Sequence, residues 1–126
     1  MPHISAYNPE LGIIETKYSG IVTFNEIVEF SSEVIITAIE NDCFFTLGDY
    51  SEAEVEITTL EIYKMPKIIA DKVAPLGVHP HKFKRAFVIA EHQKDFYFFE
   101  TVTLNSGQNA KIFRTIEDAR NWLLNK

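Results

Sequence analysis

The pattern of apolar and polar positions along the chain predicts alternating strands and helices. Its clearest feature is a run of five apolar residues between Arg85 and Glu91. A run that has no polar face is typical of a strand buried on both sides, and its β-branched and aromatic residues favour a strand over a helix. Helices must cover both faces of such a strand. We therefore expect residues 85–91 to form the central strand of a parallel or mixed sheet.

The first part of the chain predicts two antiparallel strands followed by a helix. Residues 3–7 and 11–18 are segments of strand length, and a turn sequence at 8–10 separates them. Thr23 and Glu26 have the spacing of a capping box, in which the hydroxyl accepts a bond from a free amide and the Glu reaches back. The apolar residues that follow recur at helical spacing, so we expect a long helix with one face on the sheet.

The middle of the chain predicts a strand, an acidic loop and a second helix. Residues 43–47 form a short apolar segment, and residues 49–61 contain five carboxylates without a Lys or Arg. Thr58 and Glu61 repeat the capping-box spacing. The helix that they begin contains Pro66, which removes a backbone donor, so one kinked helix and two short helices both fit the pattern.

Two helices and one strand complete the pattern. Residues 95–102 include four consecutive aromatic side chains, and we expect a helix there because the element types alternate. Residues 110–114 form a strand, and Thr115 begins a final amphipathic helix. The predicted order is β-β-α-β-α-β-α-β-α in one domain over residues 1–126. This is an α/β fold with a mixed five-stranded sheet, an antiparallel first strand and helices covering the sheet.

Composition and charge narrow the classes of function. The chain has 126 residues, a formal net charge of −6 and a single cysteine, Cys43. A nucleic-acid interface requires clustered Lys and Arg, so we expect no nucleic-acid partner. A lone cysteine forms no intramolecular disulfide, which fits a reducing compartment. The chain start has no signal-peptide pattern and no apolar run is of membrane-spanning length, so we expect a cytoplasmic protein without an integral membrane segment.

The acidic segment is the first candidate site. It contains Glu52, Glu54 and Glu56, which follow Asp49 and Ser51. A solvated face is the simplest interpretation of such a charge cluster, and a docking surface for a basic partner or a metal site are the alternatives. We predict no bound metal and no cofactor.

An apolar pocket beneath the helix that contains Pro66 is the second candidate site. Its predicted lining consists of Met65, Ile68, Ile69, Phe96 and Phe99. An apolar ligand requires a concave wall with few polar groups, and a kinked helix can act as a lid. Ordinary core packing of the same side chains is the alternative.

Catalytic motifs do not stand out in the sequence. It contains no glycine-rich phosphate loop, no nucleophile elbow and no pair of cysteines. A hydrolase or transferase pair of Ser51 and His92 at the ends of parallel strands is conceivable, but no third orienting group or oxyanion motif accompanies it. We therefore expect a protein that is not an enzyme.

Three stretches carry a resemblance to a known family. They are the strand, glycine turn and capped helix at 18–26, the strand at 85–91, and the strand, cap and helix ending in Trp-Leu at 111–123. In these stretches and in its order of elements, the chain resembles the stand-alone STAS-like proteins of bacteria. These are relatives of the anti-sigma factor antagonist fold, often grouped with CRAL-TRIO lipid-binding proteins. The resemblance spans nearly the whole chain and supports the architecture more than any activity.

The resemblance also implies a site of regulation. Antagonists of this fold carry a phosphorylated hydroxyl where the helix after the third strand begins, in an Asp-Ser-Ser-Gly setting. The matching hydroxyls here are Thr58 and Thr59, preceded by an Asp-x-Ser at 49–51. Ile57 and Leu60 replace the aspartate and the glycine of that setting. Helix capping is the alternative role for both threonines.

The predicted function follows from these observations. We expect a non-catalytic STAS-like domain that acts through a protein partner or by self-association as a homodimer, with a regulatory role. The acidic loop and the helix from Thr58 would be the docking surface. The alternative, supported by the resemblance to the CRAL-TRIO grouping, is a carrier or sensor of a small apolar, lipid-like ligand.

Overall fold

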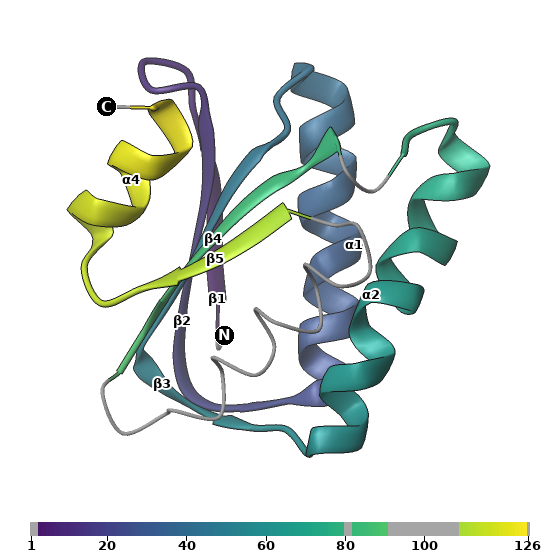
Figure 1. The fold of residues 1–126 in the computed structure, drawn as a ribbon, viewed down its shortest axis with the longest axis vertical. Coiled ribbons are helices and arrows are strands. Elements are labelled where there is room, and N and C mark those ends of the chain that lie inside the picture. The colour runs from purple at the N-terminus through teal and green to yellow at the C-terminus, as the bar shows by residue number, and fades with distance from the viewer. Residues whose placement is uncertain (1–2, 80–81, 91–108, 126) are drawn as a thin grey trace.

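The computed structural model describes residues 3–79, 82–90 and 109–125. Within these ranges the chain forms five strands, three α-helices and one 3-10 helix (Figure 1). The elements are β1 His3–Asn8, β2 Ile13–Thr23, α1 Phe24–Asn41, β3 Phe45–Glu56, α2 Thr59–Val73, η1 Ala74–Leu76, β4 Lys84–Ile89, β5 Asn109–Phe113 and α4 Ile116–Leu124. The helix expected at 95–102 lies outside the described residues.

All five strands belong to one mixed sheet in the order β1-β2-β3-β4-β5. β1 pairs antiparallel with β2, and every later pair of neighbours is parallel. The predicted fold class and the antiparallel first strand are therefore confirmed. The strand expected at 85–91 is β4, which has a neighbour on each side, but β3 lies in the middle of the sheet. An apolar run identifies an interior strand, whereas its exact place depends on the order of strands in space.

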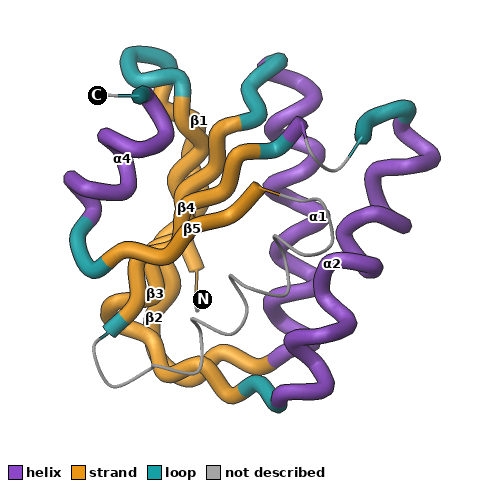
Figure 2. Tube along the Cα trace, viewed as in Figure 1, coloured by secondary structure: helices purple, strands orange, loops and turns teal. Residues whose placement is uncertain are grey.

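Helices cover both faces of this sheet (Figures 1 and 2). α1 and α2 pack against each other on one face, and α4 lies on the opposite face, where it contacts β3, β4 and β5. Right-handed crossovers between parallel strands that progress in one direction place the connecting helices on the same face. This rule accounts for α1 and α2. α4 follows β5 and covers the face opposite α1 and α2.

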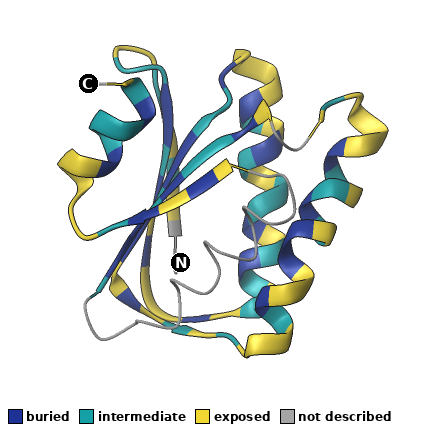
Figure 3. Ribbon diagram, viewed as in Figure 1, coloured by how far each residue is buried: buried dark blue, intermediate teal, exposed yellow. Residues whose placement is uncertain are grey.

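Two neighbouring residues on β2 show how the layers are separated. Ile13 belongs to the core beneath α4, whereas Ile14 belongs to the core beneath α1 and α2. Successive side chains on a strand point to opposite faces, so both isoleucines are completely buried. Buried residues accordingly follow the strands and the inner sides of the helices (Figure 3).

Both long helices begin with the predicted capping boxes. The Glu26 amide donates to the Thr23 hydroxyl, and the Thr23 amide donates to the Glu26 carboxylate at 3.0 Å. Thr58 and Glu61 form the same pair of bonds at the start of α2. α2 continues through Pro66 as one helix, so the alternative with two short helices is wrong.

The prediction of an acidic loop at 49–61 is also wrong, because β3 extends to Glu56. Residues 52–56 alternate between glutamates, which are exposed, and the apolar residues Ala53 and Val55, which are buried and half-buried. Such alternation is a strand pattern. The many carboxylates of the segment led to the prediction of a loop in place of a strand.

A bulge in β3 explains how β2 and β3 pair along nearly their whole length. β2 is longer than predicted and ends at Thr23. Lys17 pairs with Asp49, but Ser19 pairs with Glu52, so two steps along β2 match three steps along β3. The extra residue shifts the alternation of side chains by one position. The glutamates after the bulge therefore point away from the face that α1 and α2 cover.

Candidate ligand cavity

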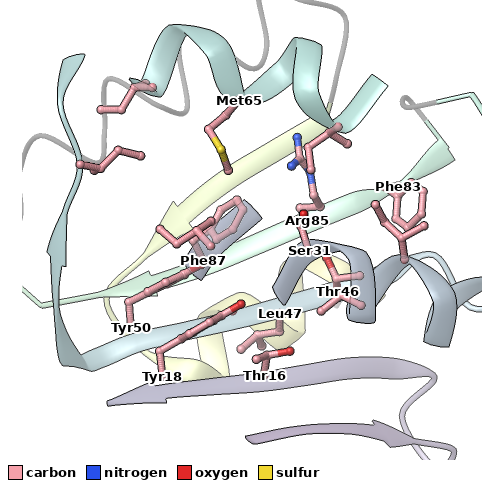
Figure 4. A pocket seen from close by; sticks show the side chains of 17 residues that line it. Thr16, Tyr18, Ser31, Thr46, Leu47, Tyr50, Met65, Phe83, Arg85 and Phe87 are labelled. Carbon is pink, nitrogen blue, oxygen red and sulfur yellow. The ribbon is translucent and has the colours of Figure 1, made fainter. Parts of the chain in front are cut away.

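A cavity of about 80 Å³ lies between the sheet and the layer formed by α1 and α2. It is lined by 17 described residues, which come from β2, β3, β4, α1, α2 and the segments beside them (Figure 4). Most of these side chains are aliphatic or aromatic. The cavity therefore brings together residues that are far apart in the sequence.

Register between neighbouring strands builds the sheet side of the cavity. Thr46 on β3 pairs with Arg85 on β4, and Gly48 pairs with Phe87. Gly48 also pairs with Thr16 on β2. Residues in register on adjacent strands face the same side of the sheet. All five positions therefore face α1 and α2.

The two helices supply the opposite side of the cavity. α1 contributes Ile27, Ser31 and Ile35. α2 contributes Ile62, Met65 and Ile69. Residues three or four apart lie on the same face of a helix, so each set of three points towards the sheet.

Stacked aromatic rings form one end of the cavity. The rings of Tyr18 and Tyr50 have centroids 4.2 Å apart and an interplanar angle of 4°. The Phe87 centroid lies 6.2 Å from that of Tyr50. A side-chain carbon at Gly48 would lie 3.0 Å from the Tyr50 ring and 3.3 Å from the Phe87 ring, so the glycine makes room for both. Burial raises the pKa of Tyr18 and raises that of Tyr50 further, so both phenols are neutral at neutral pH.

Several polar groups lie beside one another in the cavity. Figure 4 shows Arg85, Ser31 and Thr46 away from the stacked tyrosines, with Phe83 on their far side. The guanidinium carbon of Arg85 lies 6.0 Å from the ring centroid of Phe87. Burial lowers the pKa of Arg85 to about 10, against a smaller opposite influence of Tyr50. Arg85 is therefore still a cation at neutral pH.

The hydroxyl groups that line the cavity differ in their hydrogen bonds. Ser31 donates to the Val28 carbonyl at 2.6 Å, and the hydroxyls of Thr16 and Ser5 are bonded to each other at 3.1 Å. Thr46 is only 8% exposed, and its hydroxyl has no hydrogen-bond partner among the described residues. Leaving a buried hydroxyl unpaired costs free energy. The Thr46 hydroxyl is therefore available to an atom inside the cavity.

The structure places only some of the residues predicted for an apolar pocket at this cavity. Met65 and Ile69 line the cavity. Ile68 is half-buried and does not belong to the lining. Phe96 and Phe99 lie outside the described residues.

Sequence analysis missed the residues that the sheet contributes. Arg85 was interpreted as the charged end of an apolar strand and was not expected at a site, whereas it lines the cavity. The available signal was spacing by two residues, as in Thr16 and Tyr18 on β2 or Arg85 and Phe87 on β4. That signal identifies a shared face, but not which strands lie side by side.

The bulge in β3 holds Asp49 and Ser51 together. One carboxylate oxygen of Asp49 accepts bonds from the Ser51 amide at 2.9 Å and from the Ser51 hydroxyl at 2.6 Å. Asp49 is buried, and its carboxylate thereby satisfies an amide at an irregular position of the strand. His92, the expected partner of Ser51, lies outside the described residues.

Three exposed glutamates follow the bulge along β3. We call Glu52, Glu54 and Glu56 the acidic row. Lys17 on β2 lies 3.1 Å from the Glu52 carboxylate, and both side chains are more than half exposed. Such a surface pair is worth about 0–1 kcal/mol. The acidic row therefore has little influence on folding.

The two candidate phosphoacceptors have different environments. The Thr58 hydroxyl accepts a hydrogen bond from the Glu61 amide at 3.2 Å. Thr59 is the first residue of α2 and is exposed. Phosphorylation of either threonine stays a prediction.

Features of a metal site or of a membrane-spanning helix are absent from the described part of the chain. No group of three or more His, Cys, Asp or Glu side chains there is arranged to hold a metal ion. None of the helices described is long and apolar enough to cross a membrane. Cys43 is buried, and its thiol donates to the Gly12 carbonyl at 3.1 Å.

The fold is similar to that of a solved structure, whereas the sequence comparisons gave no match. No protein-family model and no curated protein matches the sequence. Among solved structures, the chain is similar to an uncharacterised DUF3478-family protein with a SpoIIAA-like fold from Shewanella loihica PV-4. The two share 17% identity with a TM-score of 0.57, over 96% of this chain and 93% of the other. The chain therefore has the SpoIIAA-like fold, which is the architecture that its resemblance to STAS-like proteins predicted.

Proposed function

We propose that the chain is a non-catalytic, cytoplasmic carrier or sensor of a small, largely apolar ligand that binds in the cavity beneath α1 and α2. The observation that carries this proposal is the cavity wall. Aliphatic and aromatic side chains from five elements meet there, and a few polar groups, among them Arg85, Ser31 and Thr46, lie beside one another. Small-molecule sites commonly combine an apolar wall with a few placed polar groups.

The size of the cavity suits a small ligand. One water molecule needs about 10–15 Å³ of such space, so 80 Å³ corresponds to about six water-sized groups. A single ring or a medium-length hydrocarbon chain is of this order. A phospholipid with two long chains is much larger.

The chemistry of the lining supports binding rather than catalysis. Its described residues include no carboxylate, imidazole or thiol. Tyr18 and Tyr50 are neutral and Arg85 is cationic at neutral pH, because burial raises the pKa of the tyrosines and leaves that of the arginine at about 10. These groups can hold and orient a ligand. None of them is a general base at neutral pH.

Filling the cavity tests this proposal. Met65→Trp places an indole in the cavity, because Met65 is buried and lines it. Leu60→Trp is the matched control, since Leu60 lies on the same helix and is 63% exposed. In native mass spectra of protein purified from cells, we expect a bound small molecule on the wild type and on Leu60→Trp. Its occupancy should fall at least about tenfold in Met65→Trp, which corresponds to 1.4 kcal/mol.

Thermal unfolding must show that both variants are folded. Ile69→Phe adds a smaller volume to the same wall and replaces Met65→Trp in this test if Met65→Trp is unstable. Equal occupancy in the cavity variant and the wild type would contradict the proposal. So would a wild-type protein that carries no small molecule under conditions that preserve weak complexes.

Partner binding through the acidic row is the second candidate function. The observation in its favour is that Glu52, Glu54 and Glu56 are all exposed on one strand and project from the same side of it. Complementary charges raise association rates with a basic partner. Self-association as a homodimer remains a separate prediction.

A further inference from the structure

Two buried threonines line the cavity on neighbouring strands, and they differ in their hydrogen bonds. Thr16 on β2 is 3% exposed, and Thr46 on β3 is 8% exposed. The hydroxyl of Thr16 is bonded to that of Ser5, which pairs with it in register between β1 and β2. The hydroxyl of Thr46 has no hydrogen-bond partner within the described part of the chain. A ligand can therefore bond to Thr46 without breaking a hydrogen bond that the fold already uses.

The position of Thr46 in the sheet directs its side chain into the cavity. Thr46 pairs with Ile14 on β2, and Ile14 is a completely buried member of the core beneath α1 and α2. Residues in register on adjacent strands face the same side of the sheet, so Thr46 also faces these helices. Figure 4 shows Thr46 among the side chains that line the cavity. Its hydroxyl is therefore within reach of a ligand atom in this space.

A buried hydroxyl at this position favours a ligand that carries an oxygen. Leaving a hydroxyl unpaired in an apolar surrounding costs free energy. A wholly apolar ligand would exclude water from Thr46 without replacing the hydrogen bond that water makes there. A threonine hydroxyl can donate its proton to a carbonyl, ether or alcohol oxygen. A ligand with one such oxygen therefore restores the bond.

The next position on the same face of β3 suits the apolar part of the ligand. Gly48 follows Thr46 by two residues, which is about 7 Å along a strand. Ring atoms of Tyr50 and Phe87 lie over Gly48, at 3.0 Å and 3.3 Å from the place of an added side-chain carbon. On the helix side, α2 contributes aliphatic side chains and Met65. The surroundings of the Thr46 hydroxyl are thus mainly aromatic and aliphatic.

We propose that the cavity binds a small, mainly apolar molecule with one oxygen acceptor, which takes a hydrogen bond from Thr46 and packs its apolar part against Tyr50 and Phe87. The inference rests on the proposed function and adds the chemical class of the ligand. Thr46 is then a residue that determines specificity. Thr16 lines the same cavity without this role, because its hydroxyl is already bonded to Ser5.

Titration of the protein with two matched probes, followed by NMR, tests the inference. Acetophenone and α-methylstyrene have the same ring and nearly the same shape, but acetophenone has a carbonyl oxygen where α-methylstyrene has a methylene group. Thr46→Val removes the hydroxyl and keeps nearly the same side-chain shape. It should weaken acetophenone binding by about threefold to tenfold, the loss of one neutral hydrogen bond. The affinity for α-methylstyrene should stay within about twofold of the wild-type value or increase.

Two further variants separate the hydrogen bond from effects on shape and folding. Thr46→Ser keeps a hydroxyl and should retain most of the wild-type affinity for acetophenone. Thr16→Val removes a hydroxyl from the same cavity and should change the affinity for either probe by no more than about twofold. Without ligand, Thr46→Val should not lower the melting temperature. Thr16→Val should lower it, because it leaves the Ser5 hydroxyl without its partner.

Several results would overturn the inference. Equal effects of Thr46→Val on both probes would do so, because that pattern indicates a change in shape. So would no binding of acetophenone, an effect of Thr16→Val as large as that of Thr46→Val, or a clear loss of stability in Thr46→Val. If Met65→Trp blocks both probes while Thr46→Val affects neither, the inference fails and the proposed function stands. Probe binding that is insensitive to Met65→Trp would count against both, because the probes then bind outside the cavity.

Discussion

Burial changes the acid–base behaviour of the stacked tyrosines Tyr18 and Tyr50. Loss of water is the largest cause of the raised pKa in both residues. A buried phenolate has no water to solvate its charge, so the neutral form persists to a higher pH than in the unfolded chain. The difference in pKa between the folded and unfolded states favours the folded state. This contribution is complete below the unfolded-state pKa of about 10 and is lost as the pH rises towards the folded-state values.

An alkaline titration of tyrosine ultraviolet absorbance tests this effect. We expect part of the tyrosinate signal of the native protein to develop only above the usual tyrosine range. Tyr50→Phe should decrease that late part, because it removes the phenol with the stronger shift. The wild type unfolded in urea is the control, since unfolding removes the burial. Complete ionisation of the native protein within the usual range would contradict the assignment.

At the scale of single elements, one of the two candidate threonines has a structural role at the start of α2. The Thr58 hydroxyl accepts the Glu61 amide, and the Glu61 carboxylate accepts the Thr58 amide at 2.8 Å. Thr59 follows as an exposed first residue of the helix. The capping role therefore belongs to Thr58.

Alanine substitutions at the two positions test this difference. Thr58→Ala should lower the free energy of unfolding by about 1 kcal/mol, because an N-cap hydroxyl is lost. Thr59→Ala should change it by no more than about 0.5 kcal/mol, as at other exposed positions. Urea denaturation measures both values. Equal effects of the two substitutions would exclude a capping role specific to Thr58.

The bulge is the second feature at the scale of elements. Asp49 and Ser51 were expected as members of a functional site, and their mutual hydrogen bonds stabilise the bulge. The same bulge turns the acidic row away from the cavity side of the sheet. The two candidate sites of this protein therefore lie on different surfaces.

At the scale of the whole molecule, this separation allows independent tests of the two candidate functions. Replacing the acidic row by lysines, in the triple variant of Glu52, Glu54 and Glu56, should decrease recovery of a basic partner severalfold in quantitative pull-downs. Stability should change little, because the row is exposed. Ligand binding in the cavity should not change.

A control must carry the same change in net charge. The triple lysine variant of Glu10, Glu29 and Glu40 provides it, since all three are exposed and lie outside β3. Equal recovery of partners by the two variants would show that net charge, rather than the acidic row, is responsible. Light scattering of the same samples measures the oligomeric state and tests the predicted homodimer.

The sequence by itself determined the local features of this protein. Both capping boxes, the antiparallel first pair of strands, the amphipathic helices and the α/β class follow from residues within a few positions of each other. Such features depend on backbone geometry and on short spacings, which a linear pattern records directly. The extent of β3 was readable in the same way, from the alternation at 52–56, although its charge favoured a loop.

Only the tertiary structure decided the middle position of β3, the place of the bulge and the lining of the cavity. Thr46 and Arg85 are 39 positions apart, and they meet because β3 and β4 are parallel and in one particular register. Register depends on how whole strands and helices pack, and a shift by one residue would reverse the face of every side chain. Local spacing contains no information on that choice. The cation in the cavity and its hydroxyl neighbour could therefore be recognised as a pair only in the folded chain.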